Sequence, residues 1–316
     1  MLISVWISAF FVIVIQLLIY AIKMRDNMSK DKFSYDKYIE LVKTGHYFVE
    51  ADKYKGIYIP HKLYKYIYLD NKDKDLFEKK IKDLEEDKIW ASISSELNDP
   101  LEFNTMVARL DGEKKNYFYE DVLARNEVFS LTDSPLNKLM WSHYASSHRG
   151  ICLEYTVIDN KQIYPVNYIH SRIDITEEVE SWIKEKDIIL NNNYISQEQN
   201  LLVAKLKRIC LSKDSVWEYE KEYRIVTRDH EAIQNEQYDD FKINKGSLHT
   251  AESLGLELTG IIIGVNNNDE SLINRIVDNI NIKRNKGMEN SGLLSNSDVK
   301  VKYVKFTDGL EMELLS

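Results

Sequence analysis

Carboxylates, aromatic rings and one guanidinium alternate in residues 217–226, WEYEKEYRIV. Because side chains along a β-strand alternate between its two faces, Glu218, Glu220 and Glu222 would share one face with the arginine. Crowded carboxylates raise one another's pKa and a fixed arginine lowers it, which suits acid–base or electrostatic catalysis. We therefore predict Glu222 and Glu220 as catalytic residues and Arg224 as a substrate-binding residue. The structural alternative is a solvated edge strand with one ordinary ion pair.

Two histidines lie in residues 141–150, WSHYASSHRG. On a helix, Trp141, Tyr144 and His148 would form one stripe, at positions i, i+3 and i+7, and we predict that this stripe binds the substrate. His143 lies on another face and is the predicted catalytic histidine. Its separation from His148 suits joint metal ligation on one helix poorly, so no metal ligands are predicted. The structural alternative is a core helix with a locally hydrogen-bonded histidine.

A turn motif, NDPLE, occupies residues 98–102. Asp99 followed by Glu102 fits a helix-capping box, which explains the motif structurally. The alternative is that both acids converge with Glu154 and a histidine around a metal ion. Residues 263–268, a strand-like end followed by glycine and asparagines, are read as an ordinary βα turn. The sequence contains no GxSxG, HExxH, CxxC or Walker pattern, so simple hydrolase, zinc and P-loop assignments have little support.

Composition narrows the range of partners. The chain has 316 residues and a formal net charge of −9, with no basic block, which argues against a nucleic-acid partner. Its two cysteines, Cys152 and Cys210, have neither metal nor redox spacing, which fits a reducing compartment. The 20 tyrosines predict half-buried strands and aromatic-lined clefts.

Residues 2–22 form an apolar run that is long enough, at about 1.5 Å of rise per helical residue, to cross the core of a bilayer. Lysine and arginine follow this run and none precedes it, so the positive-inside rule predicts a single-pass protein with its N-terminus outside and its C-terminal domain in the cytoplasm. A cleaved signal peptide is the alternative, but the basic n-region and the cleavage site that it requires are missing.

Hydrophobic patterns behind this run predict an α+β fold, a mixed β-sheet with flanking helices, preceded by one transmembrane helix. Strand-like patterns occur at residues 63–68, 90–94, 128–132, 151–155, 258–265 and 299–306. Helix-like patterns occur at residues 75–87, 134–149, 196–212 and 269–278. The predicted organisation is a transmembrane anchor at 1–24, a connector at 25–58 and a cytosolic domain at 59–316, with a βαβ-like extension at 256–316.

Four motifs in order resemble those of a widespread bacterial family that carries a domain of unknown function. They are LYKY at 63–66, NDPxE at 98–102, WxHYAxxHxGxCLE at 141–154 and WxYExEYR at 217–224. The resemblance covers residues 60–270 and implies a link to defence against phage or other mobile elements. The apolar run at 2–22 departs from the family pattern and implies a tethered effector or sensor in the bacterial inner membrane.

A second resemblance, to ADP-ribosyltransferase-like folds, concerns mechanism. Those folds combine a polar residue on an early strand, an aromatic or histidine pocket and a late ExE glutamate pair. Here Tyr64 or Lys65, the histidines and tyrosine of 143–148, and then Glu220 and Glu222 follow in that order. The resemblance implies that Tyr64 and Lys65 bind the substrate, that NAD is the candidate substrate, and that a glutamate stabilises an oxocarbenium-like ribose. No cofactor is assigned.

The predicted function is therefore a membrane-anchored bacterial defence effector that transfers ADP-ribose or cleaves NAD. A non-catalytic sensor of a ligand or phage component is the alternative, and a metal-dependent nuclease is the third hypothesis. The predicted partners are the inner membrane, through residues 2–22, a small nucleotide, and a second copy of the chain or another defence protein.

Overall fold

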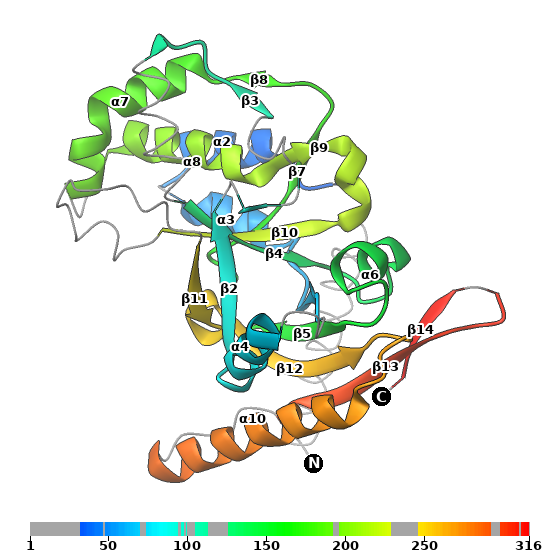
Figure 1. Ribbon diagram of the computed structural model, residues 1–316. Helices are drawn as coiled ribbons and strands as arrows, with labels where there is room; N and C mark the ends of the chain where they lie inside the picture. Colours follow the sequence, from blue (N-terminus) through cyan, green and yellow to red (C-terminus); the bar gives the residue numbers. More distant parts are fainter. Residues whose placement is uncertain are drawn as a thin grey trace, which may run out of the picture.

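The computed structural model describes residues 32–46, 48–69, 74–93, 96–97, 99, 105–112, 126–191, 196–228, 246–291, 298–309 and 311–315. These residues form an α+β fold around a curled, mixed β-sheet (Figure 1). Along the sheet the strand order is β11-β2-β4-β1-β5-β12-β13-β14, and β10 pairs with both β4 and β6.

The bounds of the elements are as follows. The large sheet contains β1 (Lys62–Ile67), β2 (Lys88–Ile93), β4 (Asn126–Thr132), β5 (Ile151–Val157), β6 (Ile163–Pro165), β10 (Glu222–Arg228), β11 (Gly246–Thr250), β12 (Leu256–Ile263), β13 (Lys300–Phe306) and β14 (Met312–Leu315). Two small parallel pairs are β3 (Met106–Val107) with β8 (Ile173–Asp174), and β7 (Asn167–Ile169) with β9 (Ser212–Asp214). The helices are α2 (Tyr35–Thr44), α3 (Val49–Gly56), α4 (Lys74–Glu85), α6 (Lys138–Tyr144), α7 (Thr176–Asn191), α8 (Gln197–Leu211), α10 (Glu270–Ser291) and the 3-10 helices η3 (Ser215–Glu220) and η4 (Glu252–Leu254).

Helices cover the sheet from several sides. Figure 1 shows α2, α3, α7 and α8 grouped at one end of the fold, and α4 and α10 at the other. The interior of the sheet and the α4–α10 side share one core, in which Leu63, Phe129 and Ile276 are fully buried. The short helix α6 packs through Trp141 against the tyrosines of β1 in a second core. Since strand β5 lies between these cores, it is buried from Ile151 to Tyr155, including the carboxylate-bearing Glu154.

The C-terminal part forms a βαβ unit. Strands β12 and β13 are parallel neighbours, and α10 connects them along the chain. An antiparallel partner, β14, then extends the sheet at its edge. The helix is longer than the predicted 269–278, because Ile280 continues its buried face and Asn281 and Arg284 hydrogen-bond to the carbonyls of Val299 and Leu258.

Strands β1 and β4 are neighbours in the sheet, but only one pair of residues is in register between them. Their register contains one pair, Tyr64 with Thr132, whereas β1 pairs with β5 over its full length and β4 pairs with β10 from Glu222 to Arg228. The side chains that follow this pair on β1 therefore line a gap in the sheet. This separation makes room for the cavity described below.

The predicted transmembrane helix is not supported. In the part of the chain that the structure describes, no helix is both long enough and apolar enough to cross a membrane. The apolar run at 2–22, on which this prediction and the inner-membrane location rested, lies outside the described residues. The fold class is corrected to an α+β fold with a mixed sheet and flanking helices, and the single-pass inner-membrane location is withdrawn.

Two predicted elements differ from the structure near the motifs. The segment before β10 is a 3-10 helix, η3, which ends at Glu220 and is followed by Lys221 in the left-handed region, with a φ of 46°. Consequently Glu218 does not join the other glutamates but pairs with Lys32 at the surface. The helix predicted over 134–149 is α6, and it ends at Tyr144 because residues 146–148 all have positive φ angles.

Candidate functional site

A cavity of about 230 Å³ lies where β1 and β4 separate. Side chains from β1, β4, α6, β9, η3 and β10 contribute to its wall. Its charged and phenolic lining from these elements comprises Tyr64, Lys65, Tyr66, Tyr144, Lys213, Glu220, Glu222 and Arg224. Glu96 and Asp99 also line the cavity, so segments that are far apart in the sequence bring four carboxylates, three cationic groups and three tyrosines to one small space.

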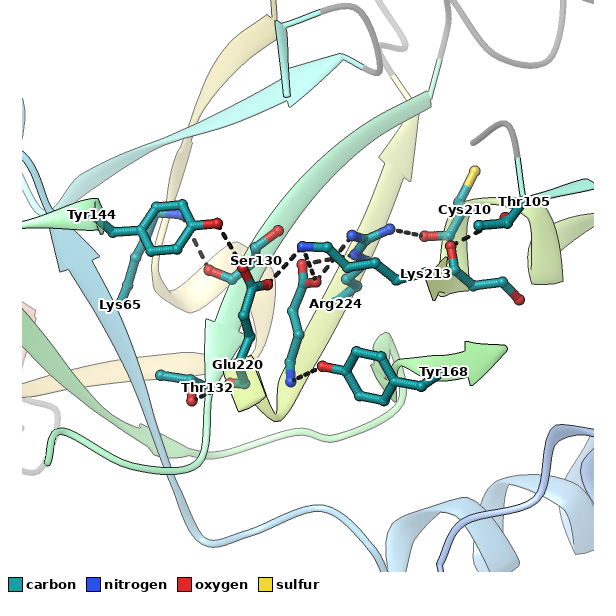
Figure 2. Close-up of polar contacts among 12 residues, drawn as sticks. Lys65, Thr105, Ser130, Thr132, Tyr144, Tyr168, Cys210, Lys213, Glu220 and Arg224 are labelled. Atoms are coloured by element: carbon teal, nitrogen blue, oxygen red, sulfur yellow. Dashed lines mark hydrogen bonds and ion pairs between the residues drawn. The ribbon is translucent and has the colours of Figure 1, made fainter. Parts of the chain in front are cut away.

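A continuous row of hydrogen bonds runs along this wall (Figure 2). The Tyr144 hydroxyl donates to Glu220 Oε1 at 2.6 Å, and Lys213 Nζ donates to Glu220 Oε2 at 2.6 Å. The same Lys213 amine donates to Glu222 Oε2 at 3.2 Å. All three charged side chains are at most 6% exposed as residues, so their charges are compensated by one another rather than by bulk water.

Arg224 fixes the second glutamate. Its Nε donates to Glu222 Oε1 at 2.8 Å and its Nη2 donates to Glu222 Oε2 at 3.0 Å, a bidentate pair. The remaining Nη1 donates to the Cys210 carbonyl at the end of α8, at 2.8 Å. The strand places these two residues on one face, since they are two positions apart on β10. Arg224 therefore positions the Glu222 carboxylate. The alternation of side chains along β10 is sufficient to explain this pairing.

These contacts set the ionisation of Glu222. Burial raises the pKa of its carboxyl, but the positive charges of Arg224 and Lys213 oppose burial and lower the pKa to about 2. Burial and the neighbouring Glu220 raise the pKa of Tyr144 well above its usual range. At neutral pH the wall thus carries a permanent negative charge on Glu222 and a protonated phenol on Tyr144, which can respectively stabilise a positive charge and donate a hydrogen bond.

Lys65, on β1, has a different environment. Its Nζ donates to the Ser130 carbonyl at 3.1 Å (Figure 2). The same Nζ lies 4.3 Å from the centre of the Phe129 ring. Within the described part of the chain, no carboxylate forms an ion pair with it. Burial lowers the pKa of Lys65 to about 8, although the more distant charge of Glu222 acts in the opposite direction.

The structure gathers six of the nine predicted site residues around the cavity. They are Tyr64, Lys65, Tyr144, Glu220, Glu222 and Arg224. Burial, with the Glu154 carboxylate as the next cause, raises the pKa of Tyr64 to about 12, so this phenol is also protonated at neutral pH. The early strand, the short helix and the late strand thus contribute to one site, in the order that the motifs have along the chain.

The other three predicted residues do not line the cavity. Trp141 is fully buried, and its indole N–H donates to the Pro135 carbonyl at 2.7 Å, so it serves the core. His148 stacks on Trp141 with ring centroids 6.3 Å apart, and burial lowers its pKa. His143 is exposed beside Tyr144, with ring centroids 6.3 Å apart.

Reasoning from the sequence missed Tyr66 and Lys213 in the cavity lining and Tyr168 beside Glu222. Lys213 follows α8 by two residues and is 6% exposed. Because a lysine that follows a helix is usually solvated, its position in the sequence did not indicate burial. Tyr168 accepts a hydrogen bond from the Glu222 backbone N–H at 2.8 Å through its hydroxyl oxygen. Tyr168 and Lys213 belong to the adjacent strands β7 and β9, so a predicted β7–β9 pairing would have been needed to find them.

The metal hypothesis gains no support from the described residues. Among them, no group of three or more His, Cys, Asp or Glu side chains is arranged to hold a metal ion. Glu154, one of the acids of that hypothesis, instead accepts hydrogen bonds from Lys62 at 2.8 Å and from Lys302 at 2.7 Å. Another of them, Glu102, lies outside the described residues.

Residues 140–225 match a family model described as "Protein of unknown function (DUF2971)". This match confirms the predicted resemblance to a family whose domain has no known function for residues 140–225, whereas the resemblance of the motifs at 63–66 and 98–102 stays a prediction. The match includes Tyr144, Lys213, Glu220, Glu222 and Arg224, so the hydrogen-bonded row lies inside the matched segment. No curated protein and no solved structure matches the chain. The family description gives no activity, and the resemblance to ADP-ribosyltransferases stays a prediction.

Proposed function

We propose that the protein is an enzyme that acts on a small nucleotide-type substrate, with NAD as the first candidate, by breaking the bond between nicotinamide and ribose. The observation that carries this proposal is the ionised Glu222, which Arg224 and Lys213 hold at the cavity wall. A second carboxylate, Glu220, lies beside it and is bonded to the hydroxyl of Tyr144. Paired carboxylates with distinct partners are the usual equipment for breaking glycosidic bonds.

The roles of the two glutamates follow from their contacts. Loss of nicotinamide leaves a positive, oxocarbenium-like ribose, and the fixed charge of Glu222 would stabilise it. Glu220 is held between the Tyr144 hydroxyl and the Lys213 amine, so it would orient the attacking hydroxyl or water, which adds to the ribose carbon and loses a proton. The products are nicotinamide and either ADP-ribose or an ADP-ribosylated acceptor.

The size of the cavity limits how much of the substrate it would enclose. Its volume of about 230 Å³ is below the usual range of about 300–1,000 Å³ for drug-sized ligands. This space suits one ring and its ribose rather than an entire dinucleotide. Tyr64 and Tyr144 offer aromatic surface and hydroxyl groups to such a ring.

The test compares the parent chain with Glu222→Gln and with a matched control, Glu154→Gln. Glu154 is equally buried and held by two lysines, but it does not line the cavity. We expect purified parent and control to release nicotinamide from NAD, and Glu222→Gln to be slower by about 100-fold. Nucleotide pools measured by mass spectrometry in expressing cells should show the same order. Equal activity of the two variants, or unchanged NAD in every sample, contradicts the proposal.

One observation favours a second candidate, a non-catalytic sensor. Every carboxylate oxygen of Glu220 and Glu222 already has a hydrogen-bond donor, so the wall is a rigid, preorganised surface. Such a surface can recognise a ligand without turning it over. Calorimetric binding of NAD, with the nucleotide recovered intact after long incubation, would support the sensor and count against the enzyme.

The biological setting is a separate matter. Participation in defence, association with another defence protein and self-association stay predictions. Phage challenge of cells that express the parent or Glu222→Gln would test the first, since a defence effector would lose its protection together with its activity.

A further inference from the structure

Two lysines line the cavity, and their surroundings are opposite in character. Lys213 Nζ lies 2.6 Å from Glu220 and 3.2 Å from Glu222, so two carboxylates favour its charged form. Lys65 Nζ has a backbone carbonyl and an aromatic ring as neighbours. A carbonyl oxygen accepts a hydrogen bond from a neutral amine as well as from an ammonium group. The hydrogen-bond partner of Lys65 therefore does not require the charge.

The fold also fixes the position of the Lys65 amine. Strand β1 is held on its other side by β5, through the register from Lys62–Thr156 to Ile67–Ile151. Beyond the Tyr64–Thr132 pair, the Lys65 side chain reaches across the gap to the Ser130 carbonyl of β4 (Figure 2). The Lys65 side chain is thus held at both ends, at its backbone by the pairing of β1 with β5 and at its amine by the Ser130 carbonyl. A group held in this way loses little additional freedom when it reacts with a molecule in the cavity.

We propose that Lys65 is a nucleophile whose neutral amine adds to the carbonyl carbon of an aldehyde or ketone bound in the cavity. The nitrogen lone pair forms the new carbon–nitrogen bond while the carbonyl electron pair moves to oxygen. The oxygen then leaves as water with the two amine hydrogens, and an imine remains. This condensation needs neither an oxidant nor a reductant.

The ionisation of Lys65 supports this chemistry. Because burial lowers its pKa to about 8, about a tenth of the amine is neutral at pH 7. An ordinary exposed lysine, with a pKa of about 10.4, is neutral in less than about a thousandth of molecules at that pH. The reactive form of Lys65 is therefore about two hundredfold more abundant.

This inference rests on the cavity being a ligand site, as proposed above, but it does not require NAD to be the ligand. NAD cleavage and the reaction of Lys65 would involve the same ribose carbon. Hydrolysis of NAD leaves a ribose whose open-chain form carries an aldehyde at the carbon from which nicotinamide departs. Lys65 would condense with this aldehyde or with the carbonyl group of another small, polar molecule.

The experiment treats the full chain with glycolaldehyde and sodium cyanoborohydride at pH 7 and follows each lysine by peptide mass spectrometry. The hydride traps an imine as a stable secondary amine. We expect Lys65 to be labelled at least tenfold faster than Lys300, an exposed lysine of β13, and Lys213 to stay unlabelled. Lys65→Arg, which keeps the positive charge but is no nucleophile, should keep its thermal midpoint and lose this fast phase.

The pH dependence separates reactivity from access. The labelling rate of Lys65 should level off above about pH 8, whereas the rate for a lysine with the ordinary pKa of about 10.4 continues to rise. Labelling of Lys65 no faster than that of Lys300, in folded protein, overturns the inference. Fast labelling without any nicotinamide release keeps this inference and removes NAD cleavage. Nicotinamide release without fast labelling does the reverse, so the two failures are distinguishable.

Discussion

Two buried glutamates, Glu222 and Glu154, are each held by two cationic side chains, but their surroundings differ. The cations around Glu154 are Lys62 and Lys302, from the nearby strands β1 and β13, and the Lys62 side chain is 43% exposed. The cations around Glu222 are both almost fully buried, and they come from β9 and from β10 itself. Glu222 lines the cavity and Glu154 does not.

This difference shows what distinguishes a candidate functional site from a buried ion-pair cluster that only stabilises the fold. Burial and paired charges are common to both glutamates, so neither property alone indicates function. What Glu222 has in addition is a cavity, a second carboxylate and a phenol that lies within hydrogen-bond reach of that carboxylate. The predictions below test whether the two clusters behave as differently as this geometry implies.

The largest effect on stability is expected from Arg224→Met. This change leaves the Glu222 carboxylate buried, with the Lys213 amine still beside it, and loss of one partner of a buried pair costs about 3–5 kcal/mol. The matched change Lys302→Met should cost less, about 1–2 kcal/mol, because the partly exposed Lys62 stays with Glu154. Urea unfolding measures both. Equal losses would mean that the two clusters are energetically alike.

The second largest effect on the free energy of unfolding is expected from acid, which protonates the Glu222 carboxylate. Glu222 has a folded pKa of about 2, below its ordinary 4.5, so its ionised form stabilises the fold above about pH 4.5. That contribution, about 3 kcal/mol, is lost as the pH falls from 4.5 towards 2. Burial raises the pKa of Glu154, but its lysines lower it on balance, so its contribution has the same sign.

Unfolding free energies of the parent and of two Glu→Gln variants, measured between about pH 6 and pH 2.5, compare these contributions. Glu222→Gln should flatten the acid limb more than Glu154→Gln does, because two nearly buried cations stabilise the Glu222 charge. A steeper acid limb in Glu222→Gln than in the parent would be inconsistent with the lowered pKa.

Hydroxyl donors provide a finer comparison. Tyr144 donates to Glu220 at 2.6 Å, and the Thr259 hydroxyl donates to Glu154 at 3.2 Å. Tyr144→Phe and Thr259→Val should each cost about 1 kcal/mol of stability, the value of one hydrogen bond. Nicotinamide release should fall about tenfold or more in Tyr144→Phe and stay unchanged in Thr259→Val. The same activity in both variants would remove Tyr144 from the site.

The smallest effect is expected from Lys62→Met. Its amine lies 2.8 Å from Glu154, but an ion pair with this degree of exposure contributes about 0–1 kcal/mol. The loss should shrink further in 1 M salt, which screens exposed charges more than buried ones. Thermal unfolding at low and high salt measures it. A loss as large as that of Arg224→Met would make Glu154 the more critical cluster.

Several elements were predictable because local patterns determine them. The alternation in β1 places Leu63 and Ile67 in one core and Tyr64 in another, which is the two-sided burial of a central strand. Helix α8 begins with a capping box of Ser196 and Gln199, a signal that depends on a few neighbouring residues. In such segments the sequence and the tertiary environment favour the same conformation.

The remaining features depend on contacts that no local pattern encodes. The change from 3-10 helix to strand occurs at Lys221, a residue type without a preference for positive φ, so tertiary structure fixes it. Lys213 enters the cavity from a β-strand of three residues. The order of the motifs indicated that Lys65 and Glu222 belong to one site, but the separation of β1 from β4 that lets them meet was not predictable.

The cavity lies between strands from early and late parts of the sequence, and this position affects how the chain folds. Lys65 lies on β1 and Glu222 on β10, with nearly half of the chain between them. Contacts between such distant segments form late, because closing a long loop costs entropy before the contacts can repay it. A molecule that fits this cavity therefore recognises the completed fold and stabilises it by mass action. A thermal-shift screen of small metabolites would thus reveal the natural ligand whatever reaction, if any, the protein performs on it.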